Sequence, residues 1–93
     1  MATNRAPEFA YLTVPPDGQL RSCVGLVLAG MAARARVGVR GLDEAADLLE
    51  DFHAEDAPTR FRFAIADECV VAEVEEPEES GRMRWRTVVE LVS

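Results

Sequence analysis

The stretch TRFRFAIADECVVAEVEEP, residues 59–77, contains two runs in which apolar residues alternate with charged or small ones. Alternation with a period of two is typical of a strand that buries one face. Asp67 and Glu68 separate the runs, so the stretch predicts a β-hairpin with a tight polar turn. The residues expected to point inward are Phe61, Phe63, Ile65, Val70, Ala72 and Val74.

The residues between these apolar positions predict how the two strands pair. Arg60 and Arg62 fall on the outer side of the first strand, and Glu73 and Glu75 fall on the outer side of the second. Opposite charges that face each other across strands contribute about 0.2–1 kcal/mol per pair. The hairpin is therefore expected to be antiparallel, with an open face that carries ion pairs.

A further strand is expected in RMRWRTVVELV, residues 82–92, after the acidic loop EPEESG. Simple alternation sorts its residues into two sets. The inward set is Met83, Trp85, Thr87, Val89 and Leu91, and the outward set is Arg84, Arg86 and Glu90. The arginines would then face the acidic side of the preceding strand.

The N-terminal half predicts one strand and one helix. FAYLTV, residues 9–14, is rich in strand-forming residues and ends at a Pro-Pro pair that cannot continue a ladder. Asp17 is the expected N-cap of a helix that continues to about Ala35. Its apolar positions at helical spacing are Leu20, Cys23, Val24, Val27 and Met31, widened by Leu26 and Leu28. Gly25 and Gly30 indicate a close contact with a neighbouring element.

A second helix is expected from Asp43, its predicted cap, onward. Its apolar stripe consists of Ala45, Leu48, Leu49 and Phe52. The element order β-α-α-β-β-β predicts an α+β two-layer sandwich, in which two helices pack on one face of a four-stranded, mainly antiparallel sheet. Residues 1–8 are expected to form a flexible arm, and residues 9–93 a single domain.

Composition narrows the function classes. The 93 residues carry a net charge of −7, which disfavours direct binding to nucleic acid or to an anionic membrane. The longest apolar run, CVGLVLAGMAA, has eleven residues, whereas a membrane span needs about twenty. The N-terminus has no hydrophobic export signal, so a cytoplasmic location is expected. The basic residues are all arginine, which fits a GC-rich bacterial genome.

Acidic residues surround the only histidine of the chain. Asp51, His53, Glu55 and Asp56 have the side chains that Zn²⁺, Mn²⁺ or Fe²⁺ prefers. On a continuing helix, however, His53 would point about 160° away from the face shared by Asp51 and Glu55. A solvated helix end is therefore the favoured interpretation. The sequence predicts neither a metal or cofactor site nor a catalytic residue.

The acidic surface of the second helix is the remaining candidate site. Such a patch ordinarily serves solubility, and its functional alternative is the docking of an arginine-rich helix of a protein partner. The candidate partner-binding residues are Asp43, Glu44, Asp47, Glu50, Asp51 and Glu55. The arginine and glutamate side chains of the sheet, or a free edge strand, offer a second surface for self-association as a homodimer.

The order of elements also resembles a known family. Leu12 to Pro15 match an L-x-V-P segment before the first helix, the hairpin 59–77 precedes an acidic strand end, and WRTVVELV is similar to a closing strand. Together they resemble the GHKL-type (histidine-kinase-like) ATPases, specifically the bacterial anti-sigma-factor serine kinases. The resemblance implies a regulatory role in sigma-factor partner switching.

The chain departs from that family where its chemistry lies. Glu50 or Asp51 stands where the family has a glutamate, but no asparagine follows Asn4 to hold Mg²⁺. EEPEESG, residues 75–81, replaces the adenine-reading motif and contains only Gly81. We infer a shortened relative that does not bind ATP, or an unrelated domain of similar outline. The expected function is non-enzymatic regulation by protein–protein contact, and the alternative is a small nucleotide-binding, serine-kinase-like enzyme with an altered active site.

Overall fold

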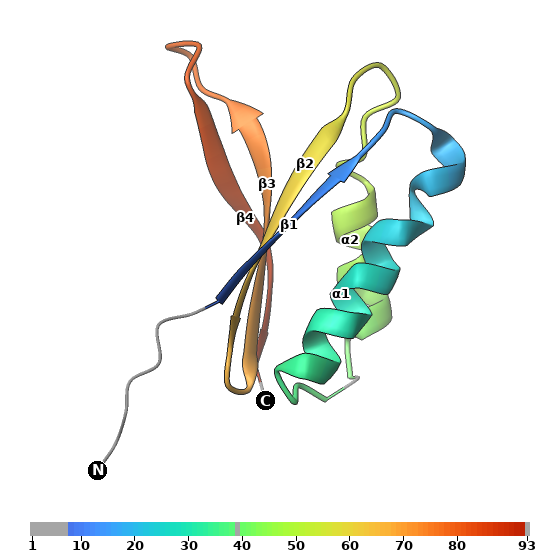
Figure 1. Cartoon of the computed structure of the whole chain (residues 1–93), viewed down its shortest axis with the longest axis vertical. Helices are drawn as coiled ribbons and strands as arrows, with labels where there is room; N and C mark the ends of the chain where they lie inside the picture. The colour runs from blue at the N-terminus through green and yellow to red at the C-terminus, as the bar shows by residue number, and fades with distance from the viewer. Residues whose placement is uncertain (1–7, 39, 93) are drawn as a thin grey trace.

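The four strands form a single antiparallel sheet in the order β1-β2-β3-β4, and both helices pack on one face of it (Figure 1). The computed structural model describes residues 8–38 and 40–92. Its elements are β1 (Glu8–Val14), the 3₁₀ turn η1 (Gly18–Leu20), α1 (Ser22–Arg34), α2 (Leu42–Glu50), β2 (Thr59–Ala66), β3 (Cys69–Pro77) and β4 (Met83–Val92). The predicted α+β architecture and element order are confirmed.

The expected N-terminal arm, residues 1–8, lies mostly outside the described residues. Its last residue, Glu8, is the first residue of β1 and pairs with Ile65 of β2. The strand expected at residues 9–14 therefore begins one residue earlier than predicted. No helix in the described part of the chain is long and apolar enough to cross a membrane.

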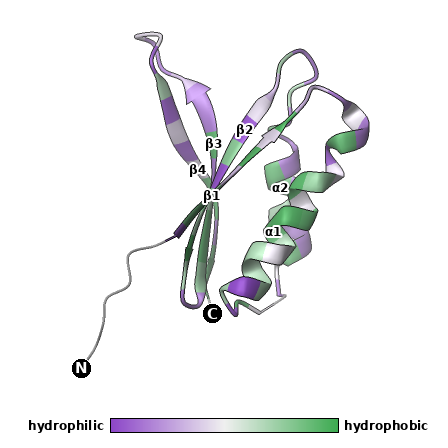
Figure 2. Cartoon of the chain, viewed as in Figure 1, coloured by the Kyte–Doolittle hydropathy of each residue, from purple (hydrophilic) through white to green (hydrophobic). Residues whose placement is uncertain are grey.

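The core lies between the helices and the inner face of the sheet. Phe61 and Phe63 of β2 are fully buried there, as are Val24 and Leu28 of α1 and Leu49 of α2. Figure 2 shows that α1 is mostly hydrophobic, whereas the end of the β3–β4 hairpin farthest from the helices is mostly hydrophilic. The helices thus cover only part of the sheet's length.

The β2–β3 hairpin has the predicted register and faces. Arg62 is paired with Glu73 across the two strands, and the polar turn at Asp67 and Glu68 joins them. Glu68 has a φ of 62°, in the left-handed region that tight turns use. The six residues expected to point inward are all buried: Phe61, Phe63, Ile65, Val70, Ala72 and Val74.

The first half of β4 has the opposite orientation to the one predicted. Neighbouring residues Ala72 and Glu73 of β3 pair with Val89 and Thr87 of β4, so Val88 is the extra residue of a β-bulge. A one-residue shift turns every preceding side chain to the other face of the sheet. Met83, Trp85 and Thr87 therefore face outward, and Arg84 and Arg86 face the helix side. Beyond the bulge the prediction is correct, because Val89 and Leu91 face the core.

The helix starts differ from the predicted ones in detail. The Asp17 side chain accepts a hydrogen bond from the Gln19 backbone N–H at 2.9 Å, so it caps η1, and α1 begins only at Ser22. Asp43 does not cap α2; it lies in the first turn, and the N-cap is Gly41 at a φ of 79°. A left-handed conformation is available to glycine at little cost.

The apolar stripe of α2 is narrower than predicted. Ala45 and Leu49 are buried and Phe52 is half-buried, but the Leu48 side chain is 56% exposed. On α1 the Leu26 side chain is 72% exposed, although Leu28 is buried as expected. Leu26 and Leu48 thus lie on the surface of the helical layer, outside the core.

Candidate interaction site

A groove runs between α1 and α2 and opens to solvent. Its α1 side consists of Ser22, Gly25, Leu26 and Ala29, and its α2 side of Asp43, Ala46, Asp47 and Glu50. Gly25 allows the two helices to pack closely here, because a Cβ added to it would stand 2.5 Å from Glu50 Oε2 and 3.2 Å from Ala46 Cβ. The close contact predicted for Gly25 is confirmed; Gly30, in contrast, has no atom within 4 Å of the corresponding position.

The groove is unusual in its charges. Asp43, Asp47 and Glu50 form no ion pair or side-chain hydrogen bond with any described residue. The three glutamates of β3, in contrast, are paired with arginines of β2 and β4. The negative charge of α2 is therefore not neutralised within the part of the chain that the structure covers.

The groove brings together three of the six predicted partner-binding residues, namely Asp43, Asp47 and Glu50. Glu44 and Asp51 are exposed on the adjacent side of α2, next to the exposed Leu48, because one residue advances the helix by 100°. Glu55 lies beyond the helix end; it is 3.7 Å from Arg21, and its side chain is 80% exposed. The predicted patch therefore divides into a groove, a neighbouring ridge and a separate loop residue.

His53 lies in the protein interior. Only 4% of the residue is exposed, and Nε2 lies 2.7 Å from the backbone oxygen of Pro15, to which it donates a hydrogen bond. Nδ1 is buried without a hydrogen-bond partner among the described residues. Asp51, Glu55 and Asp56 remain on the surface. Within residues 8–38 and 40–92, no three His, Cys, Asp or Glu side chains are arranged to hold a metal ion.

The segments expected to correspond to the kinase chemistry have other surroundings here. The Glu50 carboxylate lies against α1 in the groove, and Asp51 is exposed at the end of α2. Residues 75–81 comprise the end of β3 and a tight connection, in which the Gly81 N–H donates to the Glu78 carbonyl at 2.9 Å. This segment joins adjacent strands and forms a short turn.

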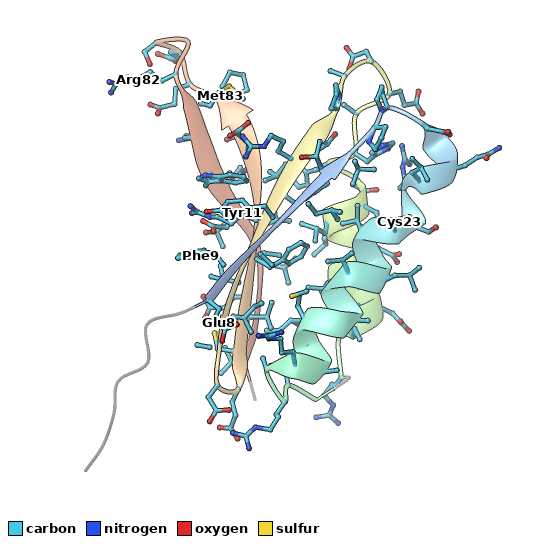
Figure 3. The ribbon with its side chains drawn as sticks, in the orientation of Figure 1. Glu8, Phe9, Tyr11, Cys23, Arg82 and Met83 are labelled. Atoms are coloured by element: carbon cyan, nitrogen blue, oxygen red, sulfur yellow. The ribbon has the colours of Figure 1, made fainter. Side chains whose placement is uncertain are left out.

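The outer face of the sheet, predicted only as a charged surface for self-association, also carries exposed aromatic and apolar side chains. Phe9, Tyr11 and Met83 are 50%, 59% and 54% exposed there, and the half-buried Trp85 ring lies beside Tyr11 with centroids 5.9 Å apart. Figure 3 shows Phe9 and Tyr11 on the side of the sheet away from the helices. The alternation of Phe9 and Tyr11 was a usable signal, but the bulge that places Trp85 with them was not.

Arg62 is the centre of this aromatic surface. Its guanidinium carbon lies 5.0 Å from the centroid of the Phe9 ring and 4.7 Å from that of Trp85, within the range of cation–π contacts. It also donates two hydrogen bonds to the Glu73 carboxylate, at 2.7 and 2.9 Å. The hydrogen bond to Glu73 raises the pKa of Arg62 above its ordinary value, while partial desolvation opposes that rise.

Glu76, Arg84 and Arg86 form a charged cluster on the helix side of β3 and β4, because the bulge turns the two arginines to that side. The Glu76 carboxylate accepts a hydrogen bond from Arg84 at 2.8 Å and lies 3.5 Å from Arg86. The hydrogen bond from Arg84 is the main cause of a lowered pKa of Glu76. The Arg86 guanidinium in turn lies 5.5 Å from the centroid of the Phe52 ring, just beyond α2.

No protein-family model matches this chain, and no curated protein or solved structure is significantly similar to it.

Proposed function

We propose that this chain is a regulatory protein that acts by protein–protein contact and binds a basic, amphipathic helical segment of its partner in the groove between α1 and α2. The observation that carries the proposal is the contrast in charge pairing. The glutamates of the sheet have arginine partners, whereas the carboxylates of the groove have none among the described residues. Carboxylates that an intramolecular cation does not neutralise attract a cationic partner.

The groove has the composition that an amphipathic helix requires. Leu26, Ala29 and Ala46 provide an apolar surface. Gly25 allows α2 to lie close to α1, with Glu50 and Ala46 against it. Asp43 and Asp47 are separated by one helical turn, so they match arginines that are also separated by one turn on the partner. Apolar contact would supply most of the affinity, and charge would supply association rate and selectivity.

The more specific part of the proposal rests on the family resemblance. We propose a cytoplasmic, bacterial protein without enzymatic activity, whose partner is a sigma factor or another regulator of transcription. The kinase-like alternative requires a nucleotide site that includes Glu50 or Asp51. Calorimetric titration with ATP and Mg²⁺ is expected to give no saturable heat; saturable binding that is lost in Glu50→Gln or Asp51→Asn would favour the enzyme.

The groove is tested with a synthetic helical peptide that has leucines on one face and arginines at i and i+4 on the other. The probe's control is a peptide of the same composition with the amphipathic spacing scrambled. Asp43→Lys with Asp47→Lys is expected to weaken binding at least about tenfold, because two attractive charges become repulsive. Equal binding of both peptides would contradict the proposed groove.

The matched control variant is Glu78→Lys with Glu79→Lys. It changes net charge by the same amount, but its positions are exposed in the β3–β4 connection, away from the groove. If both double variants lose affinity equally, the attraction depends on net charge alone. Raising the salt concentration separates the contributions, because screening weakens charge attraction but preserves apolar contact.

A further inference from the structure

We propose that the outer face of the sheet binds a second copy of this chain, so that two sheets pack face to face in a dimer. This surface lies on the opposite side of the sheet from the helices, and it is independent of the groove between α1 and α2. Unlike the groove, it combines large exposed aromatic side chains with arginines and glutamates that are paired with one another.

Exposed apolar groups on this face come from both edge strands. β1 contributes Phe9 and Tyr11, and β4 contributes Met83 and Val92, each at least 50% exposed. The half-buried Trp85 is two residues from Met83 on β4, and the half-buried Val71 lies on β3, between the edge strands. Isolated exposed apolar residues are ordinary, but a connected group marks an interaction surface. Phe9, Tyr11 and Trp85 form such a group around Arg62, whereas Val92 lies at the opposite end of β4 from Met83. Aromatic residues and methionine are also enriched at such surfaces.

The charges of this face favour a copy of the same chain over another partner. Arg60 is paired with Glu75 at 2.9 Å and Arg62 with Glu73 at 2.7 Å, so these four residues have no net charge. The whole chain carries −7, and its helical side would repel that of a second copy. Glu90 is the one unpaired charge among the described residues of this face, so two copies that approach through it meet less repulsion than through their helical sides.

The same pairing disfavours nucleic acid on this face. An aromatic surface with arginines could stack with bases, but the Arg62 guanidinium already donates two hydrogen bonds to Glu73. A phosphate would have to displace a carboxylate from Arg62 and approach a chain of strongly negative charge. A neutral, partly apolar partner surface avoids both costs, and a second copy of this face is such a surface.

The size of the face is also adequate. Four strands of this length make a surface about 20 Å across and about 25 Å long, or about 500 Å² in outline. Side-chain relief raises the accessible area toward the roughly 800 Å² per partner that specific complexes bury. Aligned packing of two twisted sheets is an established way to form such an interface.

The test is the oligomeric state of the full chain, measured by analytical ultracentrifugation from about 1 µM to about 1 mM, a range that covers weak and moderate dimers. Trp85 is the only tryptophan and lies on this face, so its emission should shift to shorter wavelength as the dimer forms. A chain that stays monomeric over the whole range would overturn the proposal.

Met83→Lys is expected to raise the dimer dissociation constant at least about tenfold, because it places a charge within the apolar face. Its matched control is Leu48→Lys, since Leu48 is 56% exposed on α2 and Met83 is 54% exposed on β4. Equal weakening by both variants would contradict a sheet-to-sheet dimer. Tyr11→Lys is a second variant, and circular dichroism confirms that each variant is folded.

Met83→Lys also separates this proposal from the one for the groove. The variant should bind the basic peptide with unchanged affinity, because Met83 does not line the groove. Loss of the dimer with peptide binding retained supports two independent surfaces. Simultaneous loss of both in a folded variant would contradict their independence.

Discussion

The carboxylate of Glu50 on α2 lies directly against the backbone of Gly25 on α1, where a Cβ would come within 2.5 Å of Oε2. Gly30, one and a half turns further along α1, has open space at the same position. A Cβ at Gly25 would thus clash with α2, whereas a Cβ at Gly30 would meet no other atom.

This contrast predicts different outcomes for two alanine substitutions. Gly30→Ala should increase the free energy of unfolding by about 0.5–1 kcal/mol, because alanine favours the helix and meets no obstacle. Gly25→Ala should increase the free energy of unfolding by less, because the Glu50 side chain must move and the new Cβ would lie only 3.2 Å from Ala46 Cβ. Urea unfolding measures both, and an equal gain would mean that the helices separate without cost.

The half-buried Arg62–Glu73 pair should stabilise the fold far more than the exposed Arg34–Glu8 pair. We expect Arg62→Ala to cost about 2 kcal/mol, since it leaves Glu73, whose side chain is only 12% exposed, without its two hydrogen bonds. Arg34→Ala should lower the free energy of unfolding by at most about 0.5 kcal/mol, because the Arg34 and Glu8 side chains are both over 60% exposed.

The difference can be assigned to the pair by a double-mutant cycle. Adding Glu73→Gln to Arg62→Ala should recover part of the loss, because the unpaired charge is then absent. Strictly additive losses would show instead that Arg62 stabilises the sheet through its contacts with the aromatic rings.

Glu76 should make stability depend on pH in the acid range. Arg84 and Arg86 lower its pKa in the folded chain, so the unfolded chain takes up the proton first as the pH falls. The resulting stabilisation is complete above the ordinary glutamate pKa and is lost as the pH falls through the lowered one. Glu76→Gln should therefore be less stable than wild type at neutral pH and lose less stability on acidification.

Urea midpoints at about pH 6 and about pH 3 measure this dependence. Glu79→Gln is the control, because Glu79 is exposed in the β3–β4 connection and has no ion pair among the described residues. If both variants have the wild-type acid response, the pair with Arg84 does not contribute to folding.

His53 is predicted to be structural. His53→Ala should lower the free energy of unfolding by about 2–3 kcal/mol, because it removes a buried ring and its hydrogen bond to the Pro15 carbonyl. Glu55→Ala, an exposed change two residues away, should stay within about 0.5 kcal/mol of wild type. A rise in melting temperature on adding Zn²⁺, absent in His53→Ala, would contradict the structural role.

The sequence allowed the β2–β3 hairpin to be predicted in full, because its inward residues alternate without interruption and its charges are complementary. The orientation of β4 could not be predicted, since the bulge residue Val88 lies between Thr87 and Val89, which favour strands as strongly as Val88 does. The burial of His53 could not be predicted either, because its hydrogen-bond partner, the Pro15 carbonyl, is distant in the sequence. Regular alternation is a local signal, whereas bulges and long-range polar contacts depend on the assembled fold.

The candidate site was only partly predictable for a similar reason. Helical spacing placed Asp43, Asp47 and Glu50 on one helix, but not the groove, which requires Gly25 of the other helix at close range. The outer face of the sheet was predicted as a charged surface, but its aromatic group was not, because it depends on Trp85 being turned outward by the bulge. In both cases the sequence identified candidate residues, but it did not show which residues lie next to them in the folded chain.

The neighbouring strands β1 and β2 are connected through both helices, and this has a consequence for how the chain folds. Glu8 pairs with Ile65, far along the sequence, while β2, β3 and β4 are joined by short turns. Closing a long loop costs more entropy than closing a short one, and contacts between distant residues form slowly. We therefore expect the β2–β4 meander to form early and β1 to complete the sheet late, once the helices are in place. Phe9 and Tyr11 would join the outer face only at that last step.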